Sequence, residues 1–489
     1  MPHVHPQHTT LRDPSKLFYQ TEYNRRLIIA SYWVILIAAI PIWWHTTSIQ
    51  RLSLPTSRVH SQAGKQLRFP VEITLENIRD VSLSAALQQL IHERIGGSGL
   101  EVRVRNQDNA HSVESYTVSA HNDIAFASQR HLMYPVRSAT LPILADTLST
   151  LLVPLTNSHH VAHYSPRYRL AFTLLNEDAA AGQAITSWDI SGAISHHLLP
   201  ILDSLSALHN FTIESQVQYH APLAFSPISL LDGAGFGLTP EDLTVFINSA
   251  EWTLSSSVSN DPVLHFIAFI PSASRRPLQI LNSQGRPSSS YTFLLPQWGG
   301  IVVYNPPPEL QESTHFPPSA LNSVFSTFAT QLLTLLGVAD VPAGVKTDSS
   351  VLTGWQLDAL LRRRALENSA EAQETLRSIV KIVDQIENMP VGQDVRGDVQ
   401  NSLTALDQMY TSASTSLNDT LHQSADALSL ASRAFFNPGM LALLYFPAEH
   451  KYAVYMPLFA SAVIPLIATA AREIRAWRRQ RREVQGVQQ

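Results

Sequence analysis

Residues Leu27 to Trp44 read LIIASYWVILIAAIPIWW, and residues Tyr452 to Ala471 read YAVYMPLFASAVIPLIATAA. Neither stretch contains a charged residue, and each is close to the ~20 apolar residues that a helix needs to cross a bilayer. Pro457 and Pro465 would break a soluble helix, but membrane-spanning helices tolerate proline. A buried core helix is the alternative for either stretch. The charged residues that flank both stretches favour two membrane spans, at 27–44 and 452–471.

The first stretch is predicted to be a signal anchor that stays in the mature protein. Arg25 and Arg26 precede it, and Trp43 and Trp44 end it, where amphipathic rings favour the headgroup layer. A cleaved signal peptide would have a shorter apolar region followed by small residues.

Basic residues predict that both ends of the chain lie in the cytoplasm. The second stretch is followed by six arginines, whereas Lys451 alone precedes it closely. These arginines are Arg472, Arg475, Arg478, Arg479, Arg481 and Arg482. Before the first stretch lie four lysines and arginines within residues 1–26, against Arg51 and Arg58 just after it. Because positive flanks stay inside, residues 1–26 and the basic tail 472–489 are expected to be cytosolic.

This orientation leaves residues 45–451 in the lumen of the secretory pathway. Two N-x-[ST] sequons lie in that stretch, beginning at Asn210 and Asn418. Both asparagines are candidate N-glycosylation sites.

The chain contains no cysteine. No disulfide, thiolate metal site or cysteine nucleophile can therefore be built from this chain alone. Hydrophobic residues make up 45% of the sequence and charged residues 15%. Such a low charged fraction fits a chain that lies partly in lipid.

Strand-like and helix-like segments alternate from residue 66 to about 310. The strand candidates are Phe69–Leu75, Leu100–Arg105, Arg167–Leu175, Phe211–Tyr219, Val263–Ile270 and Tyr291–Tyr304. The helix candidates are Ser82–Arg94, Leu141–Leu155, Asp189–Leu208 and Pro240–Trp252. This alternation predicts that residues 45–310 form an α/β or α+β sandwich, with helices covering a sheet.

Residues 311–451 are predicted to be mainly helical. Neither Trp355–Met389 nor Asp398–Phe436 contains a glycine or proline, and each carries an apolar stripe at helical spacing. We expect a long antiparallel helical hairpin with a narrow apolar seam, which packs against another surface.

Three fragments resemble binding or catalytic motifs but are incomplete. The glycines of Gly233–Gly237 fit neither the dinucleotide fingerprint nor a P-loop, so we interpret them as a turn. His159, His160 and His163 include metal-ligand spacing but have no cysteine nearby. The pair His92-Glu93 lacks the second histidine of a zinc-protease motif. No catalytic, cofactor or metal site is predicted.

Two charged clusters are interpreted as structural. Glu177-Asp178 follows a strand candidate and fits turn chemistry better than a catalytic pair. Arg362-Arg363-Arg364 lies within a helix candidate and is predicted to be a solvated face, with contact to a partner as the alternative.

Longer motifs are more specific. Phe435–Leu441, Leu444–Pro447 and Glu449–Leu458 lead into the second span. The other such motifs are Pro41–Trp44, Arg51–Pro55, Phe172–Glu177, Trp188–Ile190, Ser215–Tyr219, Trp298–Ile301 and Tyr304–Pro306. In this order they resemble the PIG-S family, a subunit family of the glycosylphosphatidylinositol (GPI) transamidase. Residues 96–165 match that family poorly.

The resemblance implies a subunit of the endoplasmic reticulum complex that replaces a C-terminal signal of a proprotein with a GPI lipid. In that family's complex the nucleophile is a cysteine of the caspase-like PIG-K subunit. The resemblance therefore implies a non-catalytic scaffold without a cofactor, whose partners are PIG-K, PIG-T, a GPAA-type subunit and PIG-U. A lumenal enzyme of glycolipid assembly and a proprotein-binding, chaperone-like module are the alternatives.

Overall fold

The computed structural model describes residues 21–47, 51–76, 81–106, 115–121, 125–135, 140–154, 161–230, 235–254, 259–307, 314–347, 352–386, 389–440 and 448–486. They divide into two compact units. Unit 1 takes its residues from Met1–Thr56, Thr375–Gln400 and Ser432–Gln489. Unit 2 takes its residues from Ser57–Glu374 and Asn401–Ala431.

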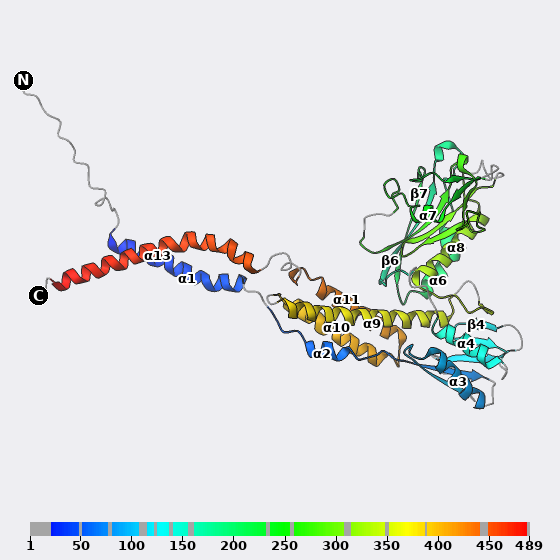
Figure 1. The fold of residues 1–489 in the computed structure, drawn as a ribbon, viewed down its shortest axis with the longest axis horizontal. Coiled ribbons are helices and arrows are strands. Elements are labelled where there is room, and N and C mark those ends of the chain that lie inside the picture. The colour runs from blue at the N-terminus through cyan, green and yellow to red at the C-terminus, as the bar shows by residue number, and fades with distance from the viewer. Residues whose placement is uncertain are drawn as a thin grey trace, which may run out of the picture. The chain divides into compact units, whose positions relative to one another are not determined.

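Unit 1 contains the two long apolar helices, α1 (Glu22–Thr47) and α13 (Ala448–Gly486). They lie side by side and run in opposite directions (Figure 1). Near the end of α1, the centroid of the Trp43 ring lies 5.0 Å from that of Phe459 in α13. Near the start of α1, Arg26 Nε donates to Glu473 at 2.9 Å, and Glu473 lies 14 residues (473 − 459) farther along α13 than Phe459. The two contacts fix an antiparallel pair.

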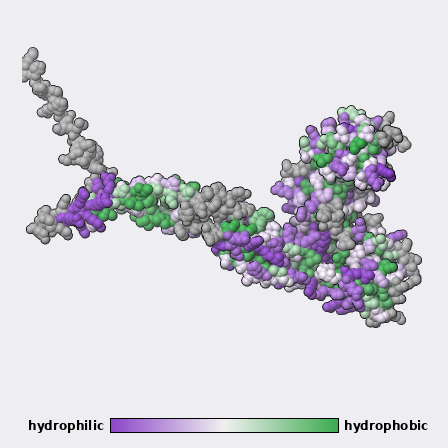
Figure 2. Space-filling model, in the orientation of Figure 1, coloured by the Kyte–Doolittle hydropathy of each residue, from purple (hydrophilic) through white to green (hydrophobic). Residues whose placement is uncertain are grey.

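Both helices are long and apolar enough to cross a membrane, over Tyr23–Trp43 and Ala453–Arg479. No part of either apolar window is buried within the protein. Figure 2 shows the pair green along much of its length and purple near its basic end. Exposed apolar surface costs ~25 cal/mol per Å² in water, whereas a bilayer removes that cost. The two apolar helices predicted from the sequence are confirmed.

A six-stranded sheet lies in unit 2, with the strand order β14-β4-β5-β3-β1-β2. Its strands are β1 (Phe69–Glu76), β2 (Leu100–Asn106), β3 (Tyr116–Ala120), β4 (Ala125–Ser128), β5 (His131–Tyr134) and β14 (Val345–Thr347). The sheet shares a core with α3 (Val81–Ile95) and α4 (Leu141–Leu152), because alternate side chains of β1 are buried against apolar residues of both helices. Among the described residues β14 is the last strand along the chain, and it pairs with β4 at one edge of this sheet.

The five-stranded sheet of unit 2 has the order β12-β13-β10-β6-β7. Its strands are β6 (Arg167–Asn176), β7 (Asn210–Gln218), β10 (Val263–Ile270), β12 (Thr292–Leu295) and β13 (Gly299–Val303). All pairs are parallel except β12 with β13. The central strands β6 and β10 are almost continuously buried. Such strands are typical of parallel sheets covered on both faces.

Helices cover one face of this sheet, and a smaller sheet covers the other. Three helices pack on one face and form a buried apolar core with it: α5 (Ile190–His197), α6 (Leu199–Ser204) and α8 (Pro318–Leu336). The second face packs against α7 (Pro240–Thr244) and a sheet of β8 (Ile228–Ser229), β9 (Phe236–Leu238) and β11 (Leu278–Ile280). The mixed α/β fold predicted from the sequence is confirmed.

Three predicted elements differ from the structure. The helix predicted over Asp189–Leu208 is split into α5 and α6, where Pro200 has no N–H to continue the helix. The helix predicted over Pro240–Trp252 ends at Thr244, because Phe246 and Trp252 both enter one core. On a single helix those two residues would point about 120° apart. The strand predicted over Tyr291–Tyr304 is the β12–β13 hairpin.

The predicted helical hairpin is a set of three helices, which corrects the sequence-based expectation. They are α9 (Gly354–Gln385), α10 (Gln393–Ser412) and α11 (Leu417–Phe435). Ser402 Oγ in α10 donates to the Ala427 carbonyl in α11 at 2.7 Å. The second glycine- and proline-free run breaks at the serine- and threonine-rich turn 413–416. There Ser416 Oγ accepts the N–H of Asp419 at 3.2 Å, as an N-cap does.

Candidate functional site

The carboxyl ends of β6 and β10 form the edge of the five-stranded sheet at which a ligand site is expected. From β6 the chain passes to β7 on one side, and later to β10 and β13 on the other. Ligands of open α/β sheets bind outside the carboxyl ends of the strands at such a switch point. Asn176 ends β6 there and Glu177 follows it, while Ile270 ends β10.

Asn176 and Glu177 are fully engaged with the chain's own loops. Asn176 Nδ2 donates to the Ile185 carbonyl at 2.7 Å, and Asn176 Oδ1 accepts the Ile185 N–H at 3.0 Å. Glu177 is 4% exposed, accepts the Ser272 N–H at 2.8 Å and pairs with the Arg275 guanidinium. The switch point is therefore filled by loop-bracing contacts between these residues.

The turn role predicted for Glu177-Asp178 is confirmed for Asp178, whereas Glu177 is the buried partner of Arg275. Asp178 caps the 3-10 helix Ala179–Ala181 by accepting the Ala180 N–H at 3.0 Å. Asp189 of the Trp188–Ile190 motif caps α5 in the same way, through the Gly192 N–H at 3.1 Å. Each carboxylate is used to begin a local turn of helix.

The two glycines of the Trp298–Ile301 motif allow the backbone of β10 and a side chain of α8 to lie close to the backbone of β13. The Trp298 ring stacks on the His265 imidazole, with 4.5 Å between ring centroids. A Cβ at Gly299 would lie 2.0 Å from the His265 carbonyl oxygen, and one at Gly300 would lie 2.0 Å from Gln331 Oε1. Only glycine fits at either position without displacement of a neighbour.

Two further motif residues brace irregular segments. Asn305 Oδ1 accepts the Leu278 N–H, and Asn305 Nδ2 donates to the Leu278 carbonyl, both at 2.9 Å. In unit 1, Arg51 donates to the carbonyls of Val383 and Ile386 at 2.7 and 3.1 Å, at the end of α9. Each side chain hydrogen-bonds to backbone groups that have no partner within their own helix or strand.

The two histidines of unit 2 whose pKa is strongly lowered do not form a catalytic pair. Burial lowers the pKa of His209 to about 4 and, with the nearby Arg169 charge, lowers the pKa of His265 to about 4. His209 packs among Tyr164, Tyr168 and Phe211, whereas His265 stacks on Trp298. Both imidazoles are neutral packing groups at pH 7. Within the described ranges, no three His, Asp or Glu side chains form a metal-binding group.

The motif fragments noted in the sequence also lie apart. Gly235 has φ +104° and leads into β9, as a turn residue does, while Gly233 lies outside the described residues. His163 is exposed, and its carbonyl accepts the Tyr168 hydroxyl, whereas His159 and His160 lie outside the described residues. His92 is exposed on α3.

The predicted solvated face at Arg362–Arg364 is wrong. Arg362 is 4% exposed and Arg364 is 3% exposed. Arg364 Nη2 donates to the carbonyls of Ala162 and Leu336 at 3.0 and 3.1 Å. This part of α9 packs inside unit 2, because the carbonyls at loop and helix ends give the guanidinium its partners.

Both sequon asparagines are exposed. Asn210 begins β7, and Asn418 lies in the first turn of α11. Within the second sequon, Thr420 is buried, and its hydroxyl donates to the Ser416 carbonyl at 2.7 Å.

Comparison with known proteins gives the family. The chain matches the PIG-S family, described as phosphatidylinositol-glycan biosynthesis class S protein, over residues 30–140 and 145–480. The chain belongs to the PIG-S family. This membership covers the apolar core of both long helices and nearly all of the region between them.

The similar curated proteins come from animals and fungi. A Mus musculus protein named GPI-anchor transamidase component PIGS is 26% identical, over 90% of this chain and 93% of its own length. A Schizosaccharomyces pombe protein named GPI transamidase component PIG-S homolog is 27% identical, over 94% and 85%. A Saccharomyces cerevisiae protein named GPI transamidase component GPI17 is 26% identical, over 87% of each chain.

Proposed function

We propose that this PIG-S family member is a non-catalytic scaffold subunit of the GPI transamidase complex in the endoplasmic reticulum membrane. Its relatives carry the name of a component of that complex, and they align over most of their length. The two long apolar helices suit a subunit held in a membrane.

One observation carries the non-catalytic part of the proposal. The switch point of the five-stranded sheet is filled by the contacts of Asn176 and Glu177 with the chain's own loops. A substrate would have to displace a buried carboxylate from an arginine and a backbone N–H to enter there. Breaking such a buried pair is strongly unfavourable. The sequence also contains no cysteine, so a thiol nucleophile must come from another chain.

A scaffold contributes by holding reactants in register. Joining a peptide acyl group to a lipid-linked amine requires both to meet in fixed geometry, and positioning is worth ~7–11 kcal/mol in favourable cases. We propose that the partners are the subunits expected from the family resemblance: PIG-K, PIG-T, a GPAA-type subunit and PIG-U.

The proposed topology has residues 1–26 and 472–489 in the cytosol and spans at 27–44 and 452–471. The lumenal part then comprises an α/β domain at 45–310 and a helical region at 311–451. The antiparallel pairing of α1 and α13 supports two tails on one side of the membrane. The six arginines after the second span support the cytosolic side for both.

The test of the scaffold role is depletion of this chain, followed by re-expression of the full chain as the control. We measure attachment of GPI to a reporter proprotein and co-purification of the other subunits from detergent. A scaffold predicts that both fall together and recover together. An intact complex that modifies the reporter at the normal rate would contradict the proposal. An intact but inactive complex would favour a catalytic role.

Glycosylation tests the topology. If residues 45–451 are lumenal and both sequons are glycosylated, Asn210→Gln or Asn418→Gln removes one glycan and increases the gel mobility of the chain. Asn322→Gln, at an exposed position outside any sequon, is the matched control and leaves mobility unchanged. Protease protection of both tails in sealed microsomes would contradict cytosolic ends.

A further inference from the structure

Four arginines lie on one face of α13, beyond its apolar stretch. Their positions follow the i, i+3, i+4, i+7 spacing that places residues on one side of a helix. They are Arg475, Arg478, Arg479 and Arg482, all with exposed side chains, and we call them the arginine face. Like charges at these spacings repel one another and destabilise a helix. The arginine face therefore favours an anionic partner.

The nearest carboxylate is already paired with α1. Glu473 is the one acidic residue between Arg472 and Arg482 in the sequence. Its carboxylate accepts from Arg26 Nε at 2.9 Å and pairs with Arg25 Nη2 at 3.0 Å. Among the described residues, no ion pair or hydrogen bond engages a guanidinium of the arginine face. The charge of this face is thus uncompensated within the described part of the chain.

The contacts of Glu473 show which way the arginine face points. Successive residues of a helix are rotated by ~100° about its axis. The four arginines therefore lie ~120–180° around α13 from Glu473, the residue that contacts α1. Figure 2 shows the basic end of the helix pair as a purple surface. The arginine face lies on the side of α13 away from α1, where a surrounding molecule can reach it.

The arginine face begins at the depth of the headgroups when residues 452–471 span a bilayer. Because α13 is continuous from Ala448 to Gly486, its rise of ~1.5 Å per residue gives this depth. Arg475 lies ~6 Å beyond Ala471, and Arg479 lies ~12 Å beyond it. The headgroup layer is ~5–7 Å thick on each side of the hydrocarbon core. A long arginine stem can turn its guanidinium back toward that layer.

Apolar side chains continue past the end of the span along the same turns of α13. Ile474 is 52% exposed, and Trp477 is 41% exposed. The Arg481 guanidinium lies over the Trp477 ring, 4.1 Å from its centroid. Tryptophan is typical of the headgroup layer, where its amphipathic ring meets both lipid and water. These side chains favour a lipid surface over an acidic protein surface as the anionic partner.

We propose that the arginine face of α13 binds the headgroups of anionic phospholipids. A guanidinium donates two parallel N–H groups to phosphate oxygens, and one basic residue near an anionic membrane surface contributes about fivefold in affinity. The proposal requires that α13 enters a bilayer. It does not depend on the side of the membrane at which α13 ends, or on the proposed role in GPI attachment.

The test measures which lipids the full chain holds after reconstitution into phosphatidylcholine bilayers. Spin-labelled phosphatidylserine or phosphatidylcholine is added in trace amounts to both leaflets. The motionally restricted part of the electron paramagnetic resonance spectrum reports lipid at the protein surface. At low salt we expect a preference for the serine lipid of at least about fivefold at this site, the contribution of one arginine.

Salt and a second anionic lipid test the cause of the preference. In ~1 M sodium chloride the Debye length falls to ~3 Å, so the preference should largely disappear. A preference of the same size at high salt would contradict binding through charge. Phosphatidylglycerol carries the negative charge without the serine, and should be preferred to a similar extent. A preference for the serine lipid alone would contradict the assignment to anionic phospholipids as a class.

A double variant locates the site. Arg475→Gln with Arg478→Gln is expected to lose most of the preference. Arg103→Gln with Arg286→Gln removes the same charge from exposed positions of unit 2 and is expected to keep it. An undiminished preference in the first variant would place the lipid elsewhere and contradict the proposal. No preference in the parent chain would also contradict it, and is the result expected if an acidic surface of another protein covers the arginine face.

Single variants keep the proposal testable if the double variant does not insert. Arg475→Gln removes the charge nearest to the apolar run, whereas Arg482→Gln removes one that lies ~16 Å beyond Ala471. Because attraction to the headgroups falls off within a Debye length, Arg475→Gln should reduce the preference more than Arg482→Gln. The reverse order would contradict binding at the membrane surface.

Discussion

Acid is expected to destabilise unit 2 through two buried histidines. Burial lowers the pKa of His209 and of His265 from 6.5 to about 4 in the folded chain. Between these pH values the unfolded chain binds more protons than the folded chain, so stability falls as the pH falls. The stabilisation by each neutral imidazole is fully present above pH ~6.5 and is lost as the pH drops through ~4.

The magnitude follows from the two pKa values. At pH 5 an unfolded histidine is almost fully protonated, whereas one with a folded pKa of about 4 is mostly neutral. Each histidine then costs about 2 kcal/mol relative to pH 7, and together they cost about 4 kcal/mol. Neither His209 Nε2 nor His265 Nδ1 has a hydrogen-bond partner among the described residues, so no acceptor there stabilises the added proton.

The assay is the urea midpoint of the full chain in detergent at pH 7 and pH 5, followed by tryptophan fluorescence. The double variant His209→Gln, His265→Gln is expected to lose most of the difference between the two midpoints. His92→Gln, at an exposed position of α3, is the matched control and keeps it. Equal midpoints for the parent at both pH values would refute the reasoning, as would an acid shift of undiminished size in the double variant.

Three further variants test contacts of the fold. Gly299→Ala places a Cβ 2.0 Å from the His265 carbonyl oxygen, and should destabilise unit 2 by the upper part of ~1–3 kcal/mol in urea unfolding. Asn305→Ala removes both hydrogen bonds to Leu278, and should cost ~1–3 kcal/mol, with faster hydrogen exchange in β11. Glu473→Gln weakens the ion pairs with two arginines of α1 and should lower the yield of disulfides between cysteines introduced on α1 and α13.

Local patterns in the sequence predicted much of the fold. The two apolar helices, and strands such as Val263–Ile270, are visible because each is a continuous apolar run between clear boundaries. The split of the second long helical run was missed because no glycine or proline marks it. Its signal was the serine- and threonine-rich stretch 411–416, whose hydroxyls compete for backbone groups.

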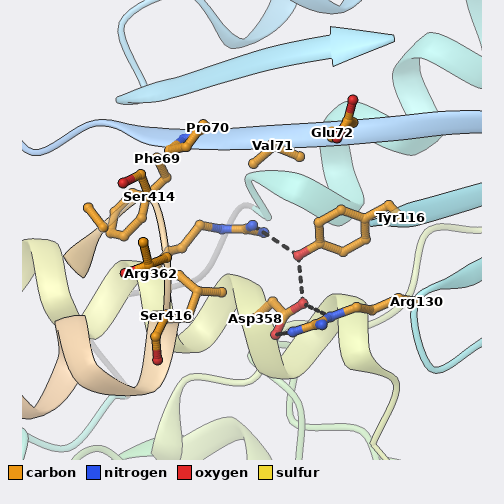
Figure 3. A pocket seen from close by; sticks show the side chains of 13 residues that line it. Phe69, Pro70, Val71, Glu72, Tyr116, Arg130, Asp358, Arg362, Ser414 and Ser416 are labelled. Carbon is orange, nitrogen blue, oxygen red and sulfur yellow. Dashed lines mark hydrogen bonds and ion pairs between the residues drawn. The ribbon is translucent and has the colours of Figure 1, made fainter. Parts of the chain in front are cut away.

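The hydrogen-bonded cluster around Asp358 (Figure 3) could not be predicted from sequence spacing. Tyr116, Arg130 and Asp358 come from distant parts of the chain and meet only after the six-stranded sheet packs on α9. The arginine triplet was misread for the same reason, since burial of a helix face by another layer leaves no trace in the triplet itself. Residues that brace loops, such as Asn176 and Asn305, lie in motifs that the sequence analysis identified, but their hydrogen-bond partners could not be predicted.

The strand order of the six-stranded sheet makes the chain between β5 and β14 an insertion within that sheet. Five of its strands precede residue 135, and the sixth is Val345–Thr347, so the whole five-stranded sheet lies between them in the chain. The two ends of this inserted segment meet where the Ala162 N–H donates to the Leu335 carbonyl at 2.8 Å. Because the two ends of the inserted segment adjoin once it has folded, the pairing of β14 with β4 does not require the closure of a long flexible loop.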